Sequence, residues 1–346
     1  MGVDLGDLAV KNTVTLQSLS GKVLAVDAFN TIYQFLASIR QEDGNPLTDF
    51  KGNITSHLSG LFFRNSRLIE NGIKLVYVFD GVAPKFKKGT RDERAKNRLE
   101  AEGKWKKALE EGDMAGAKKF AQASSRLTQE MVEESKELIS AMGIPYIQAP
   151  SEGEAQAAMM AKNNQVYASA SQDYDSLLFG APLLVRNINI TGKRKVPRQD
   201  RFIIVEPEEI RLEQTLKSLA IDQEKLIYVG LLVGTDFNAG VPKVGPKTAL
   251  KIVKEVGSFS GLKEYVKQKY NYEFEEHIDE VYDFFTNPPH NREVKIEFGK
   301  MDHDKISKIL VERHDFSLER VEKLISDIEK VVKEKGAQSK LGNWFG

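Results

Sequence analysis

Apolar runs that end in an acidic residue recur in the first half of the chain. Residues 22–27 and residues 74–80 are short apolar runs, and each closes on an aspartate. Between them, residues 30–39 and residues 58–69 carry apolar side chains at helical spacing. Strand, helix and strand in this order predict a parallel sheet whose two faces are covered by helices.

The same alternation returns further along the chain. Helices are predicted over residues 131–142 and 151–162, and strands over residues 145–148 and 165–171. The later part is mainly helical, with segments predicted over residues 226–233, 240–256 and 306–335. We therefore predict an α/β fold: a central, mostly parallel sheet with helices on both faces, in one domain that spans residues 1–335.

Residues 84–126 differ from the rest of this domain. Between Lys85 and Arg126 there are thirteen Lys or Arg residues against seven Asp or Glu residues, and several glycines interrupt the stretch. This segment is too polar for a core, so we expect exposed helices or a mobile excursion from the domain.

Composition narrows the class of protein. The 346 residues are 41% hydrophobic and include no cysteine, which excludes disulfides and cysteine-ligated zinc. No apolar run is long enough to cross a membrane, and the first residues do not form a secretion signal, so we expect an intracellular protein without a membrane partner. The 50 basic and 50 acidic residues give no net charge, whereas a DNA-binding domain is usually basic. Residues 192–201 nevertheless hold five basic residues and one acidic residue.

Acidic residues follow several of the predicted strands. The carboxyl ends of parallel strands meet at one edge of a sheet, so acids from separate segments should gather there. Gathered carboxylates need cations to neutralise them, and oxygen ligands without nearby His or Cys favour Mg²⁺ or Mn²⁺. Two such ions would suit phosphodiester hydrolysis. The candidate ligands are Asp27, Asp80, Glu152, Glu154, Asp173, Asp175 and Asp236.

Local roles could also explain individual acids. Asp27 and Asp80 could each cap the segment that follows. Ser151 and Glu154 fit the spacing of a capping box at a helix start. The sequence leaves these alternatives open beside the metal site.

A basic stripe and a glycine-rich turn are candidate phosphate contacts. Lys87, Arg91, Arg94 and Arg98 would share one face of a helix, where they could hold a scissile phosphate or simply face solvent. Residues 240–248 approach the P-loop pattern, but a proline separates the glycine from the lysine. We interpret residues 226–256 as a helix-hairpin-helix element whose backbone N–H groups grip DNA without reading its sequence.

The last residues form a separate motif. Two adjacent aromatic residues in a polar tail favour a short helical turn that docks into an apolar pocket of a partner. We expect residues 336–346 to be a flexible tail that binds through Gln338, Leu341, Trp344 and Phe345.

Together these segments resemble the flap endonucleases, a family of structure-specific 5′ nucleases, and in particular the archaeal members. The resemblance covers nearly the whole chain. It rests on Gly2-Val-Asp-Leu, Val26-Asp27-Ala28, Val78-Phe79-Asp80-Gly81, Pro150-Ser-Glu152-Gly-Glu154-Ala, Ser171-Gln-Asp173-Tyr-Asp175, Gly234-Thr-Asp236-Phe and the segment from Gln338 to Phe345.

The resemblance implies a role for most of these residues. The seven acids would bind two Mg²⁺ ions, for which Mn²⁺ could substitute, and Lys87 and Arg94 would be catalytic. Residues 84–126 would form an arch through which a single-stranded 5′ flap passes, and the hairpin would hold duplex DNA with a potassium ion. The tail would dock on the sliding clamp (PCNA) during replication and repair, and the protein would act as a monomer. The implied DNA contacts are Tyr33, Arg91, Gly240, Gly245 and Lys247.

Other functions remain open at this point. A close relative could act in excision repair or as a 5′ exonuclease. A phosphatase could use Asp173 and Asp175 as nucleophile and acid, although the basic segment, hairpin and tail would then have no role. A third alternative is an inert protein that binds DNA junctions.

Overall fold

The computed structural model describes residues 2–41, 43–190, 192–195 and 202–342. In this part of the chain a seven-stranded sheet has the order β1-β9-β6-β5-β2-β3-β4. Strands β2 to β6 run parallel to one another, whereas β9 pairs antiparallel with both β6 and β1. The strands are β1 Lys11–Thr13, β2 Val23–Asp27, β3 Lys74–Phe79, β4 Tyr146–Gln148, β5 Ala168–Ala170, β6 Leu183–Arg186 and β9 Glu208–Arg211. This confirms the predicted mostly parallel α/β sheet.

Helices cover both faces of the sheet because alternate strand residues point to opposite sides. On one face, Leu24 and Val26 of β2 pack with α1, α2 and α5, while on the other face Ala25 packs against α6. The helices are α1 Ala28–Ser38, α2 Ser56–Glu70, α5 Gln129–Ala141 and α6 Gly153–Lys162. They match the helices that apolar spacing predicts.

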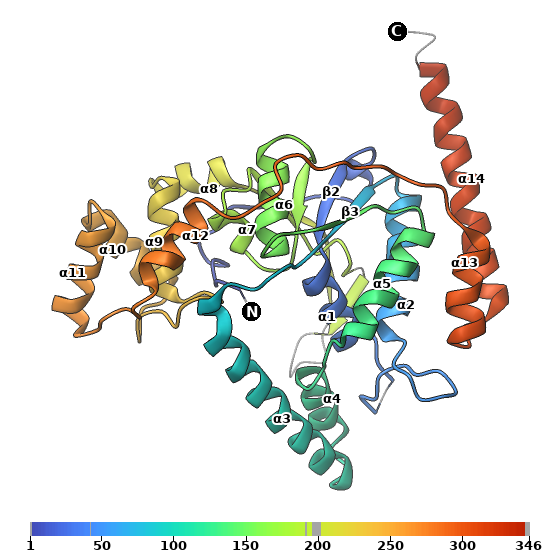
Figure 1. The fold of residues 1–346 in the computed structure, drawn as a ribbon, viewed down its shortest axis with the longest axis horizontal. Helices are drawn as coiled ribbons and strands as arrows, with labels where there is room; N and C mark the ends of the chain where they lie inside the picture. Colours follow the sequence, from blue (N-terminus) through green and yellow to red (C-terminus); the bar gives the residue numbers. More distant parts are fainter. Residues whose placement is uncertain (1, 42, 191, 196–201, 343–346) are drawn as a thin grey trace.

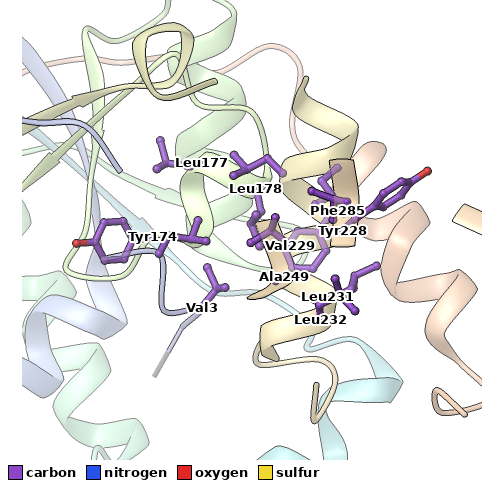
Figure 2. Close-up of a cluster of buried hydrophobic side chains, with 14 of the residues drawn as sticks. Val3, Tyr174, Leu177, Leu178, Tyr228, Val229, Leu231, Leu232, Ala249 and Phe285 are labelled. Atoms are coloured by element: carbon purple, nitrogen blue, oxygen red, sulfur yellow. The ribbon is translucent and has the colours of Figure 1, made fainter. Parts of the chain in front are cut away.

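A second group of helices extends the molecule to one side of the sheet, on the left in Figure 1. These helices share one apolar core with α7, which follows β5 and contributes Leu177 and Leu178 to the same buried cluster as Tyr228 and Phe285 (Figure 2). The elements are α7 Asp175–Leu178, α8 Leu212–Leu219, α9 Gln223–Val233, α10 Pro246–Glu255, α11 Phe259–Tyr270 and α12 Ile278–Thr286. Leu184 of β6 and Ile210 of β9 belong to the same core, which therefore joins these helices to the sheet.

The predicted arch is a pair of helices that projects from the body (Figure 1). After the short turn η2 Lys85–Lys87, α3 Lys88–Glu110 and α4 Met114–Ala123 pack against each other. Their buried contacts are alanines, Ala101 and Ala108 from α3 and Ala117 and Ala121 from α4. Small side chains let two otherwise polar helices approach closely, so the exposed-helix form of the prediction is confirmed.

A long connection leads from α12 to the last helices. Residues 287–302 have no regular secondary structure and cross the body (Figure 1). The Asn291 backbone is held by the buried Gln156 side chain, whose Oε1 accepts from the Asn291 N–H at 2.6 Å and whose Nε2 donates to its carbonyl at 3.1 Å. The Gln165 side chain likewise donates to the Arg292 carbonyl at 3.0 Å. We call residues 287–302 the strap.

The C-terminal helical region differs from its prediction at its far end. It comprises α13 His303–Ser307, a π-helix Lys308–Arg313 and α14 Leu318–Gly342. The predicted helix end before Gly336 is wrong, because α14 continues through this residue to Gly342. A single glycine costs a helix only about 1 kcal/mol, which the surrounding helix formers offset. Gln338 and Leu341 thus lie in the helix, and Trp344 and Phe345 lie outside the described residues.

A hairpin that the apolar pattern does not predict precedes β9. It consists of β7 Gly192–Lys195 and β8 Phe202–Val205, paired antiparallel. In the described part of the chain, no helix is both long and apolar enough to cross a membrane.

Candidate active site

Parallel pairing brings the strand-end acids to one edge of the sheet. Asp27 closes β2, Asp80 follows β3 directly, and Asp173 lies three residues beyond the end of β5. β2 is the neighbour of both other strands, with Val26 paired to Tyr77 and to Ala170. The predicted convergence at the carboxyl ends of the strands is therefore confirmed for these elements. We call the seven candidate acids together the carboxylate edge.

Asp27 and Asp175 each bind a backbone N–H near the edge. Asp27 caps α1, since its Oδ1 accepts from the Asn30 N–H at 3.0 Å. The Oδ1 of Asp175 accepts from the Val3 N–H at 2.6 Å. The cap that the sequence allows for Asp27 thus coexists with its place at the carboxylate edge.

The start of α6 is built differently from the capping box that its sequence suggests. Glu152 is the N-cap and makes no capping bond with its side chain. Asp80, which directly follows β3, supplies a capping bond instead: its Oδ1 accepts from the Gly153 N–H at 2.7 Å. The Glu154 Oε1 accepts from the Ser176 N–H at 3.3 Å and its hydroxyl at 3.1 Å. The capping-box prediction for Ser151 and Glu154 is therefore wrong, because more distant partners compete successfully for both residues.

Crowding of carboxyl groups raises their pKa values. Burial, with added repulsion from Asp80 and Asp173, raises the pKa of Asp27 well above its usual range. Burial and repulsion from Asp175 do the same to the pKa of Glu154. Burial and repulsion from Asp236 raise the pKa of Asp175 to about 7. Without cations, these acids therefore hold protons at a pH where ordinary carboxyl groups are charged.

Two basic side chains of the predicted stripe point into this edge. Lys87 Nζ lies 2.5 Å from Glu152 Oε2 and 3.9 Å from Asp236 Oδ2. Arg94, nearly two helical turns later, pairs with Asp236. Burial alone would lower the pKa of Lys87, but the carboxylates of Glu152 and Asp80 outweigh burial, and its pKa is raised. Lys87 is thus held charged beside the acids.

Arg98 is half-buried and also has partners within the protein. Its Nη1 donates to the Tyr33 hydroxyl at 3.1 Å, and its Nε donates to the Arg94 carbonyl at 3.1 Å. The spacing of the basic residues in α3 does not predict this hydrogen bond, because the Tyr33 hydroxyl belongs to a different helix, α1. Arg91 lies on α3, and its side chain is outside the described part.

The donor set suits a hard divalent cation. Seven carboxylates without a His or Cys among them match the preferences of Mg²⁺ and Mn²⁺. As they stand, no three acidic or histidine side chains of the described residues enclose a metal position. Several carboxylate oxygens are instead bound to Lys87, Arg94 or backbone N–H groups. The residues fit such an ion chemically, and some carboxylates must change partner to bind it.

The predicted hairpin lies between α9 and α10, over residues 234–245. Gly240 has φ +76°, and an added Cβ would come within 2.6 Å of the Val233 carbonyl group, so this glycine is required by packing. Gly245 caps α10, and an added Cβ would meet nothing within 4 Å. Lys247 is exposed, and its Nζ lies 3.3 Å from Asp7 Oδ2. Gly245 and Lys247 are therefore accessible at a helix N-terminus, which suits a phosphate.

Two family models match the chain. The XPG N-terminal domain matches residues 5–101, and the XPG I-region matches residues 143–236. These two segments include all seven acids of the carboxylate edge together with Lys87 and Arg94.

Full-length relatives are similarly informative. A flap endonuclease 1 from Aeropyrum pernix is 51% identical over 100% of both chains. Another from Archaeoglobus fulgidus is 50% identical, again over 100% of both chains.

Two solved structures share the architecture. Flap endonuclease-1 from Methanococcus jannaschii aligns with a TM-score of 0.75 at 39% identity, over 96% of this chain and 100% of that one. The catalytic core of Rad2, in complex with a DNA substrate, aligns with a TM-score of 0.71 over 95% of this chain and 100% of that one. At 24% identity the second alignment shows a common fold.

Proposed function

The chain belongs to the flap endonuclease 1 family and is a structure-specific DNA nuclease, and from this membership we propose that it cleaves 5′ flaps, and acts as a 5′–3′ exonuclease, by metal-dependent hydrolysis at the carboxylate edge. The observation that carries the proposal is the meeting of acids from separate segments of the chain with Lys87 and Arg94. If the protein were a phosphatase, the projecting helices α3 and α4 and the hairpin at residues 234–245 would have no role.

We propose that the seven acids of the carboxylate edge bind two Mg²⁺ ions, with Mn²⁺ as a substitute. The bound ions would activate the attacking water and stabilise the leaving oxygen. The raised pKa values of Asp27, Glu154 and Asp175 support this assignment, because divalent cations would relieve the same repulsion that now favours protons.

Lys87 and Arg94 would hold the scissile phosphate and stabilise its developing charge. Both side chains already reach the carboxylate edge, so they need only exchange carboxylate oxygens for phosphate oxygens. A cation placed in advance costs little reorganisation at the moment of reaction, which is how such groups accelerate phosphoryl chemistry.

The remaining DNA contacts would position the substrate. Tyr33 would stack on a base beside the site, and Arg91 would bind phosphate as the flap passes α3. Gly245 and Lys247 would grip the duplex at the start of α10, Gly240 would shape the hairpin, and a potassium ion would bind there. None of these contacts reads base edges, which suits recognition of a branched shape.

A last group of proposals concerns the cellular setting. Gln338, Leu341, Trp344 and Phe345 would dock on a sliding clamp, tethering a monomeric enzyme to replication and repair sites inside the cell. Because α14 continues to Gly342, the contact would be presented from the end of a helix.

The test compares cleavage of flapped and linear DNA with Mg²⁺ and with a chelator. We expect cuts near the flap junction that require the ion. Junction binding without cleavage would indicate an inert binder, and hydrolysis of a small phosphate monoester at a comparable rate would indicate a phosphatase. Either result would refute the proposed chemistry.

A further inference from the structure

Asn30 connects two acids of the carboxylate edge, Asp27 at the end of β2 and Asp173 in the loop after β5. It lies in the first turn of α1, where its N–H donates to Asp27 Oδ1 at 3.0 Å. Its side-chain Nδ2 donates to Asp173 Oδ2 at 2.8 Å, and its Oδ1 accepts from the Gln172 N–H at 3.4 Å. The Asn30 side chain thus links the loop that follows β5 to α1, close to Asp27, which caps the same helix.

The chemical type of this residue matters as much as its place. Lys87 and Arg94 also hold carboxylates, but as cations they compete with a metal ion for the same oxygens. An amide donates a hydrogen bond without neutralising the carboxylate. It binds Oδ2 of Asp173 and so holds this carboxyl group in a fixed orientation.

We propose that Asn30 is a positioning residue for cation binding at the carboxylate edge, acting through the orientation of Asp173. The inference rests on the proposed function, since it assumes that Asp173 is a metal ligand. Hydrogen-bond partners of metal ligands typically change metal affinity by about 10–100-fold when removed. Asn30 should therefore set the Mg²⁺ concentration at which the enzyme works, more than its rate at saturation.

The test uses Asn30→Leu, which keeps the side-chain size and removes the amide, with Asn30→Ala as a second variant if the first does not fold. Two properties are measured in the full chain: flap cleavage across a Mg²⁺ titration, and direct Mn²⁺ binding without DNA by electron paramagnetic resonance. We expect both half-saturation concentrations to rise by about 10–100-fold, with the rate largely recovered at high Mg²⁺.

A matched control separates this effect from general destabilisation. Asn65 is a buried asparagine of α2 whose Oδ1 accepts from the Tyr77 hydroxyl at 2.8 Å, with no acid of the carboxylate edge involved. Asn65→Ala should lower the melting temperature and leave both metal titrations unchanged.

The failure of this inference differs from failure of the proposed function. If Asp173→Asn abolishes Mn²⁺ binding and cleavage while the Asn30 variants titrate like the wild type, the positioning role is refuted and the metal site stands. If Asp173→Asn itself leaves Mn²⁺ binding and cleavage unchanged, Asp173 is not a ligand and both ideas are wrong. Asn30 variants that change only the melting temperature would also refute the inference.

Discussion

The carboxylate edge and the hairpin at residues 234–245 differ in how the sequence supplies their functional groups. The edge collects side chains from segments spread between Asp27 and Asp236, and these acidic groups are buried or half-buried and repel one another. The hairpin is continuous in sequence, and it would offer DNA the N-terminus of α10 and an exposed lysine. Each side chain of the carboxylate edge comes from its own segment and has its own partners, so no neighbouring residue can replace it. Backbone contacts are generic, and losing one should matter less.

The largest effect should come from a central acid. Asp80→Ala removes a proposed ligand and the bond that holds the Gly153 N–H at the start of α6. Because a catalytic metal contributes several kcal/mol to transition-state stabilisation, single-turnover cleavage at saturating Mg²⁺ should fall by about 10³-fold or more. A rate close to wild type would contradict the metal assignment, provided that circular dichroism shows a folded protein.

Loss of one cation at the edge should have the next largest effect. Lys87→Met and Arg94→Met should each lower the single-turnover rate by about 10²–10³-fold, with a much smaller change in DNA affinity, since these groups meet the phosphate most strongly in the transition state. Lys96→Met, on an exposed part of α3, is the control. Equal losses in rate and affinity would make Lys87 and Arg94 ordinary phosphate contacts.

Metal removal should change how stability depends on pH. Asp175 has a pKa of about 7 in the folded protein, whereas an aspartate in an unfolded chain has a pKa near 4. The folded state therefore binds more protons between these values, and stability must fall as pH rises through this window. With a chelator we expect a melting temperature several degrees lower at pH 7.5 than at pH 5.5. A slope that Asp175→Asn leaves unchanged would contradict this origin.

The hairpin should respond more mildly. Gly245→Ala adds a methyl group that the protein accommodates, so weaker duplex binding would report on the approach of DNA alone. We expect a loss of about 1 kcal/mol in affinity for any duplex sequence, and a salt dependence reduced by about one phosphate contact. Gly257→Ala, where the added methyl group also meets nothing within 4 Å, is the matched control. Unchanged affinity in Gly245→Ala would remove this hairpin from the DNA-binding surface.

The smallest effect on basal activity should come from the C-terminus. Deleting residues 337–346 should leave cleavage of a naked flap intact and abolish stimulation by a sliding clamp, because the segment would act only as a tether. Full stimulation of the truncated protein would place the clamp contact elsewhere, and lost basal activity would make the segment part of the folded body.

The sequence predicts the sheet and its acidic edge because both signals are local. Apolar runs closing on Asp27 and Asp80 indicate strands, and parallel pairing then determines where their ends meet. Other features depend on distant partners: Asp80, not Ser151, binds the Gly153 N–H at the start of α6, and Asn30 bonds to a residue 143 positions away. The strand at one edge of the sheet, β1, and its neighbour β9 are polar and short, so their pairing depends on neighbours that periodicity does not identify.

The strap, residues 287–302, has a consequence for how the chain can be cut and assembled. Most of its middle residues are exposed and without regular structure, which are the features that proteases prefer. Yet its Asn291 end is fastened to Gln156, 135 positions earlier, and Gly299 donates a backbone bond to Gly143. A protease that nicks the strap should therefore leave two fragments that stay associated, and two separately synthesised polypeptides divided there should reassemble into one working molecule.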